Sequence, residues 1–176
     1  MIETLISSKT RVKILLKFFL NSNSTSYLRS LEDEFGESTN SIRIELNRFE
    51  KAGFLTSFLQ GNKKLFKANN SHPLFFDINS IVKKMVGIDY VIDYILQRIG
   101  KLEKVYLIGK LAKGLDSDII DLVLVGDINK VYLAELIVKA EKKINKKIKF
   151  IVYNESEFDL EKIKEPDVHP LLIWNK

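Results

Sequence analysis

Hydrophobic residues between positions 38 and 52 recur at the spacing of an α-helix. Ile42, Leu46 and Phe49 fall on one side of such a helix, so this side is expected to be buried. The polar residues that fall largely on the other side are Thr39, Asn40, Arg43, Asn47 and Arg48. Ser38 supplies a hydroxyl that can cap the first turn. The pattern predicts an amphipathic helix that begins after Ser38 and ends before a turn at Gly53.

A pair of short strands is predicted directly after this helix. Residues 54–59 and 64–68 are strand-like, and Gly61-Asn62 between them has the composition of a tight hairpin turn. The lysines on the turn and the returning strand are Lys63, Lys64 and Lys67. Residues 38–68 carry six basic and two acidic residues, an excess of four positive charges. We therefore expect the helix and the hairpin to form a cationic surface.

Two further helices are predicted ahead of this surface. Residues 8–20 form the first helix, and its apolar stripe consists of Val12, Leu15, Leu16 and Phe19. Residues 21–26 are polar and indicate a connection. Residues 27–35 form a short helix with its acidic residues facing outward.

The order of helix, short helix, longer helix and basic hairpin resembles the winged helix-turn-helix domain of transcriptional regulators of the arsenic-repressor type. The phrase LNRFEKAGFL, residues 46–55, is similar to the exit of their recognition helix into the hairpin. The resemblance covers roughly residues 1–70 and implies double-stranded DNA as the partner. It implies that the longer helix enters the major groove and that the hairpin contacts the adjacent backbone.

The resemblance also implies a set of DNA-contacting residues. They are Thr39, Asn40, Arg43, Asn47, Arg48, Lys63, Lys64 and Lys67. The arginines and Asn47 would meet base edges or flanking phosphates, and the other residues would meet phosphates. A structural alternative stays open, in which the arginines belong to a solvated helix face and the lysines protect the hairpin edge from pairing.

The middle of the chain predicts two connected helices. Residues 73–84 form a linker helix that breaks near Gly87, and residues 88–99 continue with a broad apolar stripe. That stripe either packs on a second domain or pairs with a copy of itself. The predicted parts are a DNA-binding domain at 1–70, linker helices with a candidate dimerisation surface at 71–100, and a second domain at 101–176. A homodimer is expected, since DNA operators are usually two half-sites read by a two-fold protein.

The second domain alternates predicted strands and helices. The strands are expected at 104–108, 119–125 and 147–153, and the helices at 130–144 and 155–164. The strand at 119–125 is almost continuously apolar, which places it in the centre of a sheet. Residues 109–117 are expected to form a loop, and the apolar tail 168–174 is expected to dock back on a domain.

The segment IGKLAKGLDSDIIDLVLVG, residues 108–126, resembles the signature of the DNA polymerase β-type nucleotidyltransferase superfamily. In that family a Gly-Ser pair and a short loop hold a triphosphate, and two aspartates at alternate strand positions bind two Mg²⁺ ions. The matching positions are Gly109, Ala112, Gly114, Ser117 and the strand 122–125. The resemblance covers about residues 100–160. It implies an α+β chain: a winged helix-turn-helix followed by a small α/β nucleotidyltransferase-like domain with a mixed sheet.

Three departures from the family pattern imply that this domain has lost transfer chemistry. Lys110 stands in place of the phosphate-holding serine. Asp118 and Asp121, the weak candidates for metal ligands, are out of step with the paired aspartates. The strand at 148–153 contains no acid where a third carboxylate is needed. We therefore expect no catalytic residues and no cofactor.

The glycine-containing loop is a candidate site for a nucleotide or another small anionic effector. Its residues are Gly109, Lys110, Lys113 and Gly114, and both lysines and loop amides favour an anion. The alternative is that the lysines are solvated and that the domain serves dimerisation or partner contact.

Composition narrows the classes of partner. The 176-residue chain has a formal net charge of +5 and a pI near 9.2, which favours a polyanionic partner. It contains no cysteine, which excludes disulfides and thiolate metal sites. It shows no leader-like segment and no run of about 20 apolar residues, so a cytoplasmic protein without a membrane partner is expected.

The main functional hypothesis is a sequence-specific DNA-binding transcriptional regulator whose second domain is a catalytically degenerate nucleotidyltransferase-like module. One alternative is a Mg²⁺-dependent nucleotidyltransferase, which requires an intact carboxylate set. Another is an antitoxin-like interaction protein, which requires a partner protein.

Overall fold

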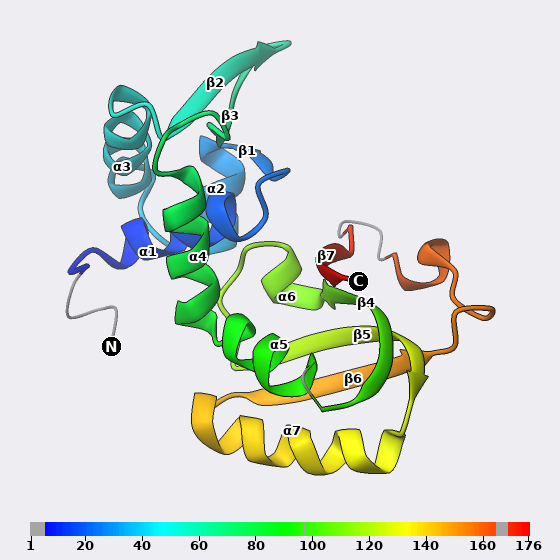
Figure 1. The fold of residues 1–176 in the computed structure, drawn as a ribbon. Helices are drawn as coiled ribbons and strands as arrows, with labels where there is room; N and C mark the ends of the chain where they lie inside the picture. The colour runs from blue at the N-terminus through cyan, green and yellow to red at the C-terminus, as the bar shows by residue number, and fades with distance from the viewer. Residues whose placement is uncertain (1–5, 97, 165–168) are drawn as a thin grey trace. The chain divides into compact units, whose positions relative to one another are not determined.

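The computed structural model describes residues 6–96, 98–164 and 169–176, and the fold is α+β (Figure 1). Contacts between residues divide the chain into two compact units. The first unit contains Met1–Val82 and Gly114–Asp116, and the second contains Lys83–Lys113 and Ser117–Lys176. Among the described residues, no helix is long and apolar enough to cross a membrane.

Three helices build the body of the first unit. They are α1 (Lys9–Leu15), which continues as the π-helical turn η2 (Leu16–Leu20), then α2 (Leu28–Phe35) and α3 (Thr39–Lys51). The backbone N–H of Ser41 donates to the Ser38 hydroxyl at 3.2 Å, so the predicted cap of α3 is confirmed. The predicted stripe of Ile42, Leu46 and Phe49 is buried. The amphipathic pattern therefore identified the inner face of α3 correctly.

A three-stranded antiparallel sheet completes the first unit, in the order β1-β3-β2. β2 (Leu55–Gln60) and β3 (Lys63–Ala68) form the predicted hairpin, and Gly61 in its turn has a φ of +59°, a region that favours glycine. β1 (Thr25–Tyr27) pairs with β3, where the sequence indicated only a polar connection. Residues 58–64 are all exposed, so the hairpin tip stands in solvent.

Two helices follow the hairpin, α4 (Phe75–Val86) and α5 (Ile88–Leu96). They meet at Gly87, the predicted break, whose φ is +85°. The apolar residues of the predicted second stripe that are buried are Ile88, Val91, Ile95 and Ile99. α5 contacts α7 (Lys130–Ile144) of the same unit. This burial accounts for the stripe without a second copy of the chain.

The second unit contains a four-stranded mixed sheet in the order β6-β5-β4-β7. The strands are β4 (Gly100–Ile108), β5 (Ile119–Ile128), β6 (Lys147–Tyr153) and β7 (Leu171–Asn175). β5 is central, as predicted, and it pairs parallel to β6 and antiparallel to β4. The parallel pair requires a crossover, which α7 provides at the predicted bounds. The apolar tail forms β7 along β4, and its predicted first residue, position 168, lies outside the described residues.

The central strand β5 contributes buried side chains to both faces of this sheet. Ile120, Leu122 and Leu124 of β5 are buried and alternate with Val123 and Val125, so the two sets point to opposite faces. The face of the second set carries a cluster with Tyr106 and Ile163, against which Ile108, Tyr153 and Phe158 pack.

The prediction of a helix at residues 155–164 is wrong. The structure has a turn at Asn154–Phe158, followed by a single 3₁₀ turn, η3 (Leu160–Ile163). Phe158 stacks on Tyr106 and Ile163 joins the same cluster. Positions five apart do not share one face of a continuous α-helix, so the irregular backbone lets both side chains reach the sheet.

Candidate nucleic-acid interface

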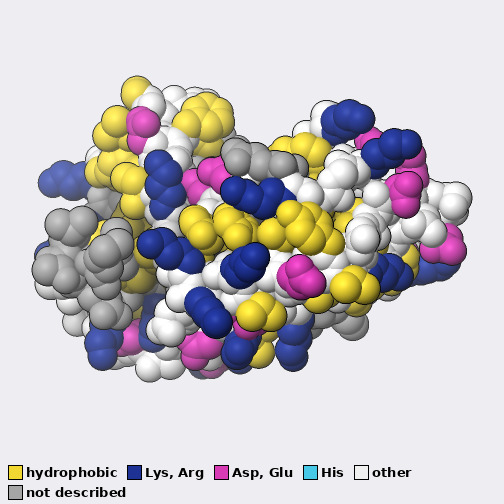
Figure 2. Space-filling model, turned by 60° about the horizontal axis from the view of Figure 1, so that its bottom comes forward, with side chains coloured by type: hydrophobic (Ala, Val, Ile, Leu, Met, Phe, Trp, Pro, Cys, Tyr) yellow, Lys and Arg dark blue, Asp and Glu magenta, His cyan; other side chains and the backbone are white. Residues whose placement is uncertain are grey.

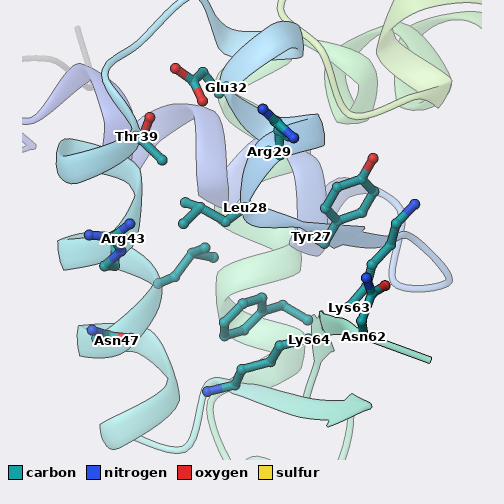
Figure 3. A pocket seen from close by; sticks show the side chains of 12 residues that line it. Tyr27, Leu28, Arg29, Glu32, Thr39, Arg43, Asn47, Asn62, Lys63 and Lys64 are labelled. Carbon is teal, nitrogen blue, oxygen red and sulfur yellow. The ribbon is translucent and has the colours of Figure 1, made fainter. Parts of the chain in front are cut away.

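A groove with a volume of about 890 Å³ lies in the first unit, between α2, α3 and the hairpin (Figure 3). Thr39, Arg43 and Asn47 follow one another along α3 at intervals of four residues and form one wall. Arg43 and Asn47 are exposed. Their side chains therefore remain available to a ligand in the groove.

The hairpin forms the opposite side of the groove. Its contributing residues are Asn62, Lys63, Lys64 and Phe66. The ammonium of Lys63 lies 4.4 Å from the centre of the Tyr27 ring, a cation–π contact that orients the lysine. Lys64 Nζ lies 2.8 Å from Glu50 Oε2, and its hydrogen bond, followed by that of Ser57, lowers the pKa of Glu50. Glu50 thus offsets part of the charge of Lys64, whereas Lys63 lies against an aromatic ring.

The end of β1 and the N-terminal part of α2 supply a side of the groove that the sequence analysis did not single out. Tyr27, Arg29 and Glu32 line the groove here, with Leu28 at its apolar floor (Figure 3). Arg29 is exposed. The signal available in the sequence was a basic residue at the start of the helix that precedes α3.

Four basic side chains and one acidic side chain line the groove. They are Arg29, Arg43, Lys63 and Lys64 against Glu32. Leu28, Leu46 and Phe66 provide apolar surface between them. The lining is therefore cationic and partly apolar, and its charge suits a polyanionic ligand.

Three of the predicted DNA-contacting residues do not line the groove. Asn40 is exposed outside it. Lys67 faces the opposite side of the hairpin from Lys64, because side chains alternate along a strand, and it lies over the Phe58 ring at 5.7 Å. Arg48 Nη1 binds Glu45 Oε1 at 2.9 Å.

Glu45 is the centre of an ion-pair network at the buried side of α3. Arg11 Nε lies 2.9 Å from Glu45 Oε2, and Arg11 Nη2 donates to Oε1 at 3.2 Å, so α1 and α3 are joined by two parallel hydrogen bonds. Burial on its own raises the pKa of Glu45, but Arg11 and Arg48 together hold it below its ordinary value. Arg48 thus forms an ion pair with a carboxylate of its own helix.

The glycine-containing loop of the second unit begins with a four-residue helix, α6 (Gly109–Ala112), where the sequence predicted loop throughout. Gly109 has a φ of +67°, and a Cβ at this position would lie 2.7 Å from Asp121 Oδ2. A carboxylate therefore fills the space beside the glycine at which the resemblance expects a phosphate.

The four predicted anion-binding residues differ in their surroundings. Lys110 is exposed and Lys113 is half-buried. Gly114 belongs to the first unit by its contacts, and a Cβ there would lie 2.5 Å from Lys17 Cα. Close packing against the backbone thus explains this glycine without a ligand.

The candidate carboxylates also lie apart. Asp121 is the third residue of β5 and pairs with Ile108 of β4, and its neighbour in register on β6 is Lys149. Asp118 precedes β5 and lines a separate hollow near the end of α7. No group of three or more histidine, cysteine, aspartate or glutamate residues in the described part of the chain is arranged to hold a metal ion.

Comparisons with known proteins give little further information. No protein-family model matches the chain, and no curated protein matches it. Among solved structures, the chain is similar to the crystal structure of AF1382 from Archaeoglobus fulgidus, with a TM-score of 0.39 and 17% sequence identity. The match covers 47% of this chain and 94% of that chain. A similarity at this level identifies no family.

Proposed function

We propose that this protein is a sequence-specific DNA-binding transcriptional regulator whose first unit is a winged helix-turn-helix. The groove between α3 and the hairpin carries the proposal. It brings Arg43 and Asn47, two side chains that suit base edges, into one cavity with Lys63 and Lys64. Residues from two consecutive elements, α3 and the hairpin, thus form a single cationic surface with hydrogen-bonding groups at its wall.

Each wall of the groove has a distinct chemical role in this proposal. Arg43 can donate two parallel hydrogen bonds to guanine, and Asn47 can both donate to and accept from adenine. Thr39, at the first turn of α3, lies where backbone N–H groups favour a phosphate. Lys63 and Lys64 neutralise phosphates from the hairpin, and Arg29 does so from α2.

We propose that the second unit is a nucleotidyltransferase-like domain without transfer chemistry. The donor set supports this. Asp121 is in register with the cation Lys149 and lies against Gly109, so the described residues do not fit a pair of Mg²⁺ ions, which need several carboxylates. Transfer of label from a nucleoside triphosphate, abolished by Asp121→Ala, would contradict this part of the proposal.

A two-fold homodimer in the cytoplasm fits this function, with a small anion or nucleotide as its effector. Dimerisation would involve a surface other than the buried stripe of α5. Sedimentation of the protein with and without a double-stranded operator measures the number of copies on the DNA.

In-vitro selection of bound duplexes tests the main proposal. The wild-type protein should enrich a defined sequence, and log affinity should fall steeply with log salt. Arg43→Lys is the informative variant, because it retains the charge and loses the paired donors. It should keep the salt slope and relax the preference at one or two base pairs by about 1–3 kcal/mol. A wild-type protein that is not retained on DNA at low salt, or enriches no sequence, would refute the proposal.

A further inference from the structure

A second cationic surface lies on the other unit, where α7 ends and β6 begins. Residues 139–149 contain six lysines and one glutamate, a net charge of +5. The formal net charge of the whole chain is also +5, so the remaining residues are neutral in sum. A large share of the positive charge of this protein is therefore outside the groove described above.

The six lysines, called here the α7–β6 surface, are Lys139, Lys142, Lys143, Lys146, Lys147 and Lys149. Lys139, Lys142 and Lys143 are exposed and lie three and four residues apart, so they share one side of α7. Lys147 and Lys149 are exposed on β6, the edge strand of the sheet. Figure 2 brings forward the side that is lowest in Figure 1, where α7 lies, and Lys and Arg side chains are spread over it.

Part of this charge is engaged within the fold. The ammonium of Lys146 donates to the backbone carbonyl of Ser117. Glu141 Oε2 lies 3.1 Å from Lys147 Nζ, and its other oxygen accepts the backbone N–H of Ile148 at 2.8 Å. These hydrogen bonds, that of Ile148 first, lower the pKa of Glu141, so it is ionised at neutral pH and serves one lysine. Asp118 lines the adjoining hollow of about 480 Å³ together with Lys142, Lys146 and Lys147.

The known structural uses of lysine explain only part of this cluster. Cations in the last turn stabilise a helix, which accounts for Lys142 and Lys143. Lysines on an edge strand prevent pairing with other chains, which accounts for Lys147 and Lys149. Neither use accounts for Lys139, which lies on the same exposed side of α7 as Lys142 and Lys143. Lys149 instead shares a sheet face with Asp121, its neighbour in register on β5.

The chemistry of the surface selects a phosphate backbone over base edges. Lysine is a flexible point charge, whereas paired recognition of a base edge uses arginine or an amide, and the six cations here are all lysines. The large apolar side chains exposed on α7 are Val131, Tyr132 and Val138, too small an area for insertion into a lipid surface.

We propose that the α7–β6 surface is a second contact for the phosphate backbone of double-stranded DNA. This inference rests on the proposed function, since it assigns to the second unit a share of binding to the same duplex. The surface adds affinity that is independent of sequence and sensitive to salt, and it lengthens the protected DNA. The first unit alone chooses the sequence.

Two triple variants with equal charge test the inference. One replaces Lys139, Lys142 and Lys143 by glutamine, and the control replaces Lys101, Lys104 and Lys162, which are exposed elsewhere on the same unit. Both lower the net charge by three, so a difference between them reports local contacts and not total charge. Binding of the full chain to selected and to unrelated duplexes is measured from 50 to 300 mM salt.

The α7 variant should lose at least tenfold in affinity for both duplexes at 100 mM salt. Its log–log salt slope should fall by about 2 to 3, because each lost phosphate contact removes about 0.9. The control should retain at least half of the wild-type affinity. Equal behaviour of the two variants, with both folded by circular dichroism, would overturn the inference while the proposed function stands.

Two further measurements decide whether DNA or lipid is the ligand of this surface. If the wild-type protein fails to bind any duplex, the proposed function itself fails. Vesicles containing anionic phospholipid provide the second test, because polybasic surfaces also bind lipid headgroups. Retention on such vesicles that the α7 variant loses, with unchanged DNA binding, would assign the surface to a membrane and overturn the inference.

Discussion

Glu45→Gln should destabilise the first unit and leave its groove intact. The Glu45 side chain is 7% exposed and binds Arg11 Nε and Arg48 Nη1, both at 2.9 Å. Glutamine retains the size of the side chain but removes its charge, so both arginines lose their counter-ion. None of these three residues lines the groove.

The size of the effect follows from exposure. A hydrogen bond that involves a charged group contributes about 1.5–3 kcal/mol to stability. Arg11 and Arg48 keep 37% and 62% of their side-chain exposure, so water replaces part of what is lost. We expect Glu45→Gln to lower the free energy of unfolding of the first unit by about 2–3 kcal/mol. Glu50→Gln, the matched control in α3, removes a more exposed pair and should lower it by under about 1 kcal/mol.

The effect should depend on pH with a definite sign. The pKa of Glu45 lies below its ordinary value of 4.5 in the folded protein, so the unfolded chain takes up the proton first as pH falls. The network therefore contributes its full stability above the unfolded pKa and loses it as pH falls through the folded pKa. The difference between wild type and Glu45→Gln should shrink below about pH 4.

Urea unfolding followed by two signals measures this prediction. Far-ultraviolet circular dichroism reports the helices of both units, whereas fluorescence of Trp174, the single tryptophan, reports β7 of the second unit. The dichroism transition of the first unit should move down by about 1 M urea, with the fluorescence transition unchanged. A shift no larger than that of Glu50→Gln at pH 7, or one that persists undiminished at pH 3, would refute the reasoning.

Three further substitutions test local features of the fold. Gly109→Ala should destabilise the second unit by about 1–3 kcal/mol, because its φ is positive and its Cβ would meet Asp121; Asp121→Ala in the same chain should recover part of this loss in the Trp174 unfolding curve. Asn129→Ala should cost about 1 kcal/mol in the same curve, since the Asn129 side chain accepts two backbone N–H groups at the start of α7. Ser38→Ala should cost a similar amount in the circular dichroism curve alone, and an equal shift in fluorescence would contradict the assignment of α3 to the first unit.

Local patterns predicted the elements whose stability is decided locally. α7 and β6 have the bounds that periodicity and length indicated, and the α3 cap follows from a serine ahead of an apolar stripe. β1 escaped prediction because three residues in a polar stretch become a strand only when β3 pairs with them. The conformation of residues 155–164 was not predicted, because Phe158 and Ile163 are held by packing against the sheet and not by a helical repeat.

The sequence predicted that the candidate interface is cationic, but it predicted only some of the residues that line the groove. Arg43 and Asn47 line the groove because they lie one turn apart on the same side of α3, and Lys63 and Lys64 line it from the first two positions of β3. Arg48 lies on the same helix but pairs with Glu45, which is held in turn by Arg11. Such a contact between residues 34 positions apart has no local signal. Arg29 joins the groove through the packing of α2 on α3, which is equally invisible in the sequence.

The strand order of the second unit determines which strand edges remain unpaired while the chain is being synthesised. β4 and β5 are adjacent in the sequence and can pair while later residues are still being synthesised. The neighbours on the two outer sides, β6 and β7, come only after α7 and after η3. During translation, the nascent central hairpin therefore carries two open hydrogen-bonding edges. The emerging chain closes one edge with β6 and then the other with β7, so interruption of synthesis before β7 would leave an edge available for aggregation.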